Sequence, residues 1–156
     1  MLNPLKTLLT NFFLPEDSGH AVDDARSLQL ATAVLLVEVM RADASFNPQE
    51  RAATVAALRT QFTLTDDEVD RLLAQAEHTA KTANDYFSFT HAMNAQYTQA
   101  QKINVVELMW KVAYADGHLD AHENHVISKV AGLLYVTHGE YIAAKMYAKQ
   151  AAESGH

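Results

Sequence analysis

The sequence predicts an all-α domain, and three observations support this prediction. The 156 residues include 26 Ala but only three Pro and five Gly, a composition that favours helices over short strands joined by turns. Two stretches, 28–42 and 103–115, are apolar nearly all round, which is typical of helices buried on most of their surface. Helix-start signals recur between and after them. We therefore expect two central helices with other helices packed around them.

Five helix starts are marked by a capping residue followed three residues later by Glu or Gln. These pairs are Asn47 and Glu50, Thr65 and Glu68, Thr98 and Gln101, Asp120 and Glu123, and Thr137 and Glu140. Pro48 falls at a first helical position, where its missing N–H is not needed. Together with the apolar periodicity, these signals predict helices over about 48–61, 66–82, 85–96, 121–134 and 138–152.

The chain is also similar to itself. Residues 42–50 (ADASFNPQE) align with residues 115–123 (ADGHLDAHE) at an offset of 73, and residues 64–69 align with 136–141 at an offset of 72. We interpret this similarity as an internal duplication within a domain that spans residues 24–156. It predicts two three-helix repeats, about 24–82 and 98–152, related by a pseudo-twofold axis around the two central helices. The helix over 85–96 would bridge them.

The N-terminus has a different pattern. Leu5, Leu8, Leu9, Phe12 and Phe13 have the spacing of an amphipathic helix over residues 1–14, and residues 15–23 are polar, contain a Gly and suggest a linker. The apolar stripe is expected either to fold back onto the domain or to dock on a protein partner or a lipid surface. No apolar run reaches the roughly 18 residues of a membrane span, and no signal-peptide cleavage site follows. We expect a cytoplasmic protein.

Charge and composition exclude several classes of function. The formal net charge of −7 argues against nucleic acid as a partner, because the phosphate backbone would be repelled. The absence of cysteine excludes disulfides, thiolate metal sites and cysteine nucleophiles. Neither a nucleophile elbow nor a Gly-rich phosphate loop is present. We therefore expect a protein that is not an enzyme.

The strongest candidate site is an acidic loop in each repeat. Residues 116–123 (DGHLDAHE) follow the last eight positions of an EF-hand loop, but the first half of that loop is replaced by apolar helix. The remaining carboxylates, Asp116, Asp120 and Glu123, suit a hard divalent cation, Ca²⁺ or Mg²⁺ rather than Zn²⁺. The alternative is structural. Asp120 and Glu123 would then form only a capping box, and Asp116 would only end the preceding helix.

Two charged residues inside the central apolar stretches need partners. Glu38 and Lys111 lie five residues before Asp43 and Asp116, so they occupy equivalent positions in the two repeats. An unpaired charge among apolar side chains would be costly. We expect Glu38 and Lys111 to form an ion pair near the pseudo-twofold axis, unless Glu38 turns toward the first acidic loop as a further oxygen ligand.

These segments resemble the TerB-like proteins associated with tellurite resistance, most closely their stand-alone bacterial branch. The resemblance covers about residues 24–148 and is carried by 35–51 (LLVEVMRADASFNPQER), 108–123 (LMWKVAYADGHLDAHE) and 85–90 (DYFSFT). It implies an all-helical fold with two central helices. It also implies a role in metal binding or in scaffolding stress-response complexes, often at the inner face of the membrane.

Residue by residue, the resemblance points to Asp43 and Glu50 in the first repeat and to Asp116 and Glu123 in the second. Ala44 departs from the glycine that is more usual after the first acidic residue. Tellurite itself is not implied as a ligand, since an acidic site would repel an oxyanion.

Two functions therefore remain open. The first is a module that binds a divalent cation through Asp43, Glu50, Asp116, Asp120 and Glu123. The second is a protein-interaction scaffold in which the acidic motifs serve only as helix caps, and an exposed apolar surface such as the stripe of residues 1–14 captures a protein partner.

Overall fold

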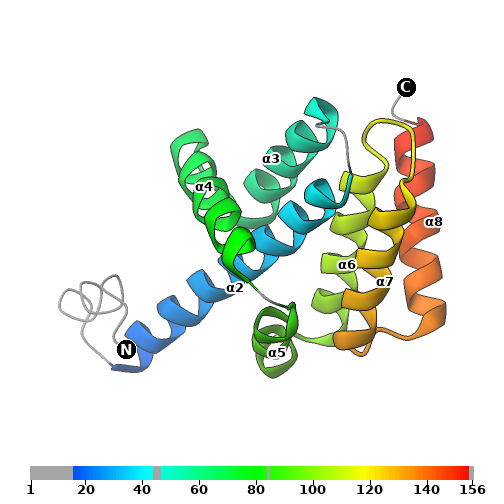
Figure 1. The fold of residues 1–156 in the computed structure, drawn as a ribbon. Coiled ribbons are helices and arrows are strands. Elements are labelled where there is room, and N and C mark those ends of the chain that lie inside the picture. The colour runs from blue at the N-terminus through cyan, green and yellow to red at the C-terminus, as the bar shows by residue number, and fades with distance from the viewer. Residues whose placement is uncertain (1–15, 44–46, 84, 155–156) are drawn as a thin grey trace.

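The structure is a computed structural model that describes residues 16–43, 47–83 and 85–154, with side chains described from residue 25 onward. Helices make up nearly all of these ranges and no strand occurs in them, which confirms the predicted all-α class. The helix predicted over residues 1–14 lies outside the described residues. The helices are α2 (Glu16–Ala42), α3 (Pro48–Phe62), α4 (Asp66–Thr82), α5 (Phe87–Gln96), α6 (Gln99–Ala113), α7 (Ala121–Leu133) and α8 (His138–Ser154) (Figure 1).

Helices α2 and α6 form the centre of the domain, as their apolar sequences predict. Every residue from 31 to 37 of α2 is buried, and Trp110 of α6 is among the largest side chains with no exposed surface. Helix α2 contacts α3, α4, α5, α6 and α7, while α6 also contacts α3, α7 and α8. In Figure 1, α3 and α4 pack on one side of α2, and α7 and α8 lie beside α6. A helix surrounded in this way is buried over most of its surface, which explains its largely apolar circumference.

Helix α2 begins earlier than the sequence pattern indicated. The predicted linker over 15–23 is wrong from Glu16 onward, because residues 16–23 form the first turns of α2. Acidic residues at a helix N-terminus are favoured by the helix dipole, and a single Gly costs only about 1 kcal/mol there. The polar composition therefore marks an extension of a helix, not a break in it.

The two predicted repeats have matching helix ends. Thr65 caps α4 and Thr137 precedes α8, and in both places the threonine oxygen accepts an N–H from a glutamate three residues later. The residues that end the preceding helices, Thr63 and Tyr135, both adopt the left-handed conformation, with φ of 52° and 58°. Neither is a glycine, so the same uncommon backbone conformation recurs at an offset of 72. These local matches agree with the sequence alignment, while the duplication itself stays a prediction.

The predicted ion pair between Glu38 and Lys111 is wrong. Glu38 accepts a hydrogen bond from Arg41 at 2.9 Å, and Lys111 lies 3.4 Å from Glu107. Each charge is thus paired with an opposite charge one turn away on its own helix. An ion pair across the apolar core is therefore not needed.

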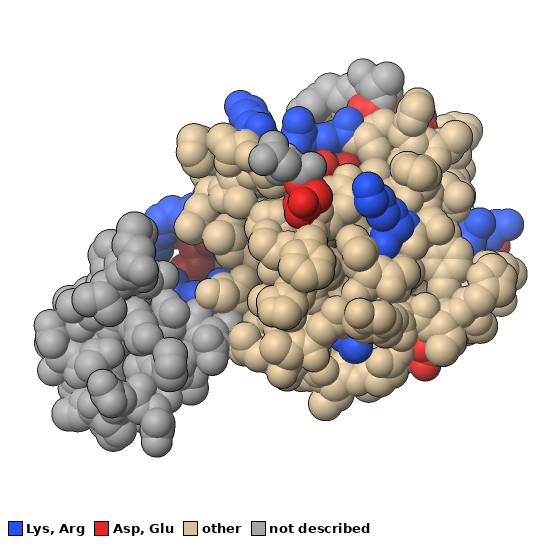
Figure 2. Space-filling view, turned by 60° about the horizontal axis from the view of Figure 1, so that its bottom comes forward, with Lys and Arg blue, Asp and Glu red and all other residues tan. Residues whose placement is uncertain are grey.

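The described part of the surface carries its charges in small groups. No helix in these ranges is both long enough and apolar enough to cross a membrane. On the face in Figure 2, basic side chains are scattered, acidic ones lie among them, and most of the visible surface is uncharged. Binding by this face is therefore expected to depend on particular side chains and not on a broad field of one sign.

The central position of α2 leads to a stability prediction. Leu36 has no exposed surface, so Leu36→Ala should leave a cavity and lower the free energy of unfolding by about 2–5 kcal/mol. Urea titration followed by circular dichroism measures this loss. Met146→Ala on α8 is the control, because Met146 is 45% exposed and its removal should change stability by less than about 0.5 kcal/mol. Similar losses in both variants would contradict the central position of α2.

Candidate metal centre

The two acidic corners predicted as separate sites meet in one place. Asp43 follows α2, Glu50 lies in the first turn of α3, and Asp116 follows α6. One carboxylate oxygen from each of these three residues lies within 4.8 Å of the others. The C-terminal ends of α2 and α6 lie at the same side of the domain, as Figure 1 shows. The cluster is therefore built from both halves of the chain.

Asn47 links the two corners directly. Its side-chain oxygen accepts the N–H of Glu50 at 3.1 Å and so caps α3, while its Nδ2 donates to Oδ2 of Asp116. The other oxygen of Asp116 accepts the N–H of His118 at 3.0 Å, across a turn in which Gly117 has φ of 85°. The sequence identified Asn47 as a cap but gave no sign of this second contact.

In the second corner, Asp120 and Glu123 both cap α7, and Glu123 also has one oxygen that takes no part in the cap. Asp120 accepts the N–H of His122 at 2.7 Å, and Oε1 of Glu123 accepts the N–H of Asp120 at 3.1 Å, so the predicted capping box forms. Asp120 is not one of the three residues whose oxygens converge, and its role as a ligand stays a prediction. Glu123 is fully buried, and its Oε2 has no hydrogen-bond partner among the described residues.

Glu50 is the most unusual residue of the cluster. It occupies the position that corresponds to Glu123, yet its carboxylate does not return to the backbone of Asn47 and instead points into the protein. The residue has no exposed surface, and neither carboxylate oxygen has a hydrogen-bond partner in the described ranges. Burial of an ionised carboxylate without partners is strongly unfavourable, so this group requires a proton or a cation.

In the absence of a cation, protonation of Glu50 removes its buried negative charge. Burial, together with the neighbouring carboxylates of Glu123, Asp116 and Asp43, raises the pKa of Glu50 to about 10. Burial also raises the pKa of Glu123, opposed by its contacts with Glu50 and with the N–H of Asp120. Two ionised carboxylates cannot hydrogen-bond to each other, because both only accept. When Glu50 is protonated, its O–H can donate a hydrogen bond to Glu123.

A divalent cation is the other way to stabilise the cluster. Two oxygens on opposite sides of a Ca²⁺ ion lie roughly 4.6–5.2 Å apart, twice the usual Ca–O distance, and oxygens on adjacent sides lie closer. The separations within 4.8 Å among Asp43, Glu50 and Asp116 fall in this range. Glu123 supplies a fourth carboxylate beside Glu50. The donor set consists of oxygen alone, which hard cations prefer.

Fold and cluster together define a helical module with an acidic centre where two helix pairs meet. The family model described as "Tellurite resistance protein TerB" matches residues 29–146, a range that contains both acidic corners and both central helices. The chain belongs to the TerB family. No curated protein and no solved structure matched the chain.

The raised pKa of Glu50 leads to a prediction about stability and pH. In the unfolded chain this carboxyl titrates near 4.5, whereas in the folded, metal-free protein it keeps its proton up to about pH 10. The stabilisation is therefore complete below 4.5 and is lost as the pH rises toward 10, by at most about 1.4 kcal/mol per pH unit. We expect the metal-free protein to unfold at lower urea concentration at about pH 8.5 than at about pH 6.

Glu50→Gln tests the source of this dependence. A glutamine cannot ionise, so the variant should lose most of the decrease between these two pH values. Glu153→Gln removes an exposed carboxyl near the end of α8 and should keep the wild-type dependence. An unchanged slope in Glu50→Gln would contradict the assigned protonation.

Proposed function

We propose that this chain is a non-enzymatic TerB-family module that binds one divalent cation at the junction of its two acidic corners. One observation carries the proposal: Glu50 is fully buried, faces other carboxylates and has no hydrogen-bond donor for either oxygen among the described residues. A helix cap does not require this arrangement, because Asn47 already caps α3. A cation between Asp43, Glu50 and Asp116 would account for it.

The ligand set supports a hard cation. Carboxylate oxygens from Asp43, Glu50, Asp116 and Glu123 would supply up to four negative charges, with further positions open to water. Ca²⁺ and Mg²⁺ fit this chemistry better than Zn²⁺, which favours nitrogen and sulfur ligands. A bound cation would replace the proton of Glu50 and bridge α2 and α3 to α6 and α7. It would thereby fix the two halves of the domain to each other.

The alternative is a scaffold without metal, in which the acidic residues only cap helices. The capping box between Asp120 and Glu123 favours this alternative for the second corner. It does not account for Glu50, whose side chain caps nothing. A protein partner, a cytoplasmic location and a setting in tellurite or stress response remain parts of our proposal that rest on the family and the sequence. The negative cluster makes a cation, not the tellurite oxyanion, the expected ligand.

A thermal melt of chelator-stripped protein tests the cation site. Added Ca²⁺ or Mg²⁺ should raise the melting temperature, because a ligand that binds only the folded state stabilises it by about 2.7 kcal/mol at a hundredfold excess over Kd. Glu50→Gln combined with Asp116→Asn should abolish the rise, since two of the converging oxygens lose their charge. Mn²⁺, Zn²⁺ and Ni²⁺ in parallel melts would establish the order of preference.

Asp67→Asn is the matched control, because it removes one exposed carboxylate from the first turn of α4 without touching the cluster. It should keep the full response to cations. If no cation at about 1 mM changes the wild-type melt, the capping alternative is correct, because even a weak site of that affinity contributes measurable stability. An equal loss in Asp67→Asn would show a response to surface charge only.

A further inference from the structure

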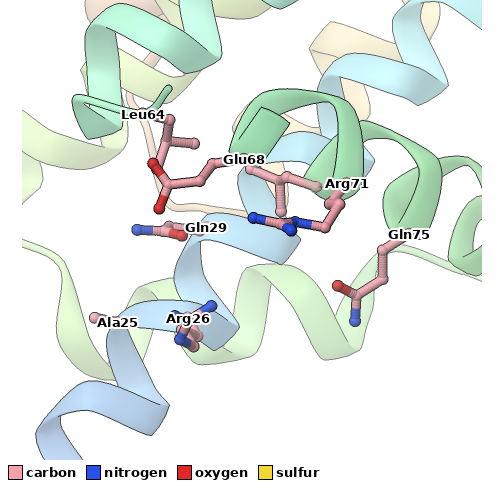
Figure 3. Close-up of a pocket in the computed structure, with 8 residues that line it drawn as sticks. Ala25, Arg26, Gln29, Leu64, Glu68, Arg71 and Gln75 are labelled. Atoms are coloured by element: carbon pink, nitrogen blue, oxygen red, sulfur yellow. The ribbon is translucent and has the colours of Figure 1, made fainter. Parts of the chain in front are cut away.

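A pocket on the opposite half of α2 from the acidic cluster brings together two arginines that form no hydrogen bond or ion pair with the described residues. It lies between α2 and α4, has a volume of about 580 Å³ and falls within the size range of small-molecule sites. Figure 3 shows Arg26 and Gln29 on α2, with Arg71 and Gln75 reaching from α4. Leu64 and Leu72 add apolar surface to the lining.

The two guanidinium groups differ from the other arginines of the chain. Of its five arginines, Arg41, Arg51 and Arg59 each form an ion pair. Arg26 and Arg71 form neither a hydrogen bond nor an ion pair in the described part of the chain, and both line the same pocket. In a protein with a net charge of −7, this pocket is unusual because its lining holds two cations and one carboxylate, Glu68, and therefore carries a net positive charge; the two cations also repel each other. An anion between them would remove this repulsion.

Glu68 limits which anions can enter. Its Oε1 accepts the N–H of Thr65 at 2.9 Å, a bond that lowers the pKa of Glu68, with smaller contributions from Arg71 and Arg26. The carboxylate is thus mainly part of the α4 capping box, and Figure 3 places it at the end of the pocket near Leu64. A ligand with negative charge at both ends would be repelled there, whereas a neutral or apolar end would contact Leu64.

We propose that this pocket binds a small organic anion that carries its charge at one end only, in a carboxylate or phosphate group that lies between Arg26 and Arg71. Guanidinium groups are planar and hold such oxygens through paired hydrogen bonds, which Lys cannot match. The side-chain amides of Gln29 and Gln75 provide two further donors at the same walls. The remainder of the ligand packs on Leu64 and Leu72. This site is separate from the acidic centre and does not depend on metal binding.

Titration of the metal-free, full-length protein with phenyl phosphate and with benzoate, followed by amide NMR shifts, tests the pocket. We expect saturable shifts confined to residues 25–29 and 64–75. The combination of Arg26→Gln and Arg71→Gln should weaken binding at least about tenfold, since each lost charged hydrogen bond is equivalent to about one decade or more in Kd. Inorganic phosphate and succinate, run as separate arms, should bind more weakly, because the first lacks an apolar part and the second carries charge at both ends.

Arg51→Gln on α3 is the charge-matched control and should bind like wild type, because Arg51 pairs with Glu77 and does not line the pocket. Circular dichroism checks that both variants remain folded, as expected for exposed residues. The absence of saturable shifts with either aromatic anion up to about 10 mM would overturn the proposal, as would equal weakening in Arg51→Gln. Tighter binding of succinate than of benzoate would overturn the assigned selectivity.

Discussion

The burial of Glu50 and Glu123 between two helix corners is the constraint on which the arrangement of this domain depends. Both residues have no exposed surface, and they come from different halves of the chain. Two carboxyl groups can be adjacent inside a protein only when a proton or a cation lies between them. The relative position of the halves is therefore fixed by electrostatics as well as by apolar packing. A change in the occupant of the cluster would act directly on the contact between α3 and α7.

The central helices explain why these corners meet. Helices α2 and α6 contact each other and end at the same side of the domain, so the connections that follow them are brought close together. The hydrogen bond from Asn47 to Asp116 joins the two connections. Glu50 and Glu123 have no exposed surface there, whereas Asp43 and Asp116 are half-buried. The acidic centre is thus a consequence of how the core is packed, since a solvated corner would leave the same residues ionised and separate.

Local features of the fold could be predicted from the sequence, and the contact between the halves could not. The capping pairs placed the starts of α3 and α7 correctly, because a cap depends only on residues within one turn. The polar start of α2 was missed, since polar helices and linkers have similar compositions. Asp120 shows a different limit. Asp120 precedes a helix and has Glu123 three positions later, a spacing that fits a helix cap and a metal ligand equally well. Only three-dimensional contacts distinguish the two roles.

The difference between the two corners also explains how half of a loop can form a binding site. The second corner resembles only the last part of an EF-hand loop, so by itself it lacks oxygens on one side. In the proposed site the first corner supplies them through Asp43 and Glu50. Glu50 can do so because Asn47 caps α3 without it, whereas in the second corner Glu123 also accepts the N–H of Asp120. The inexact match between the repeats is therefore consistent with one shared site. If both corners used their glutamate as a cap, Glu50 would have one carboxylate oxygen fewer to offer a cation.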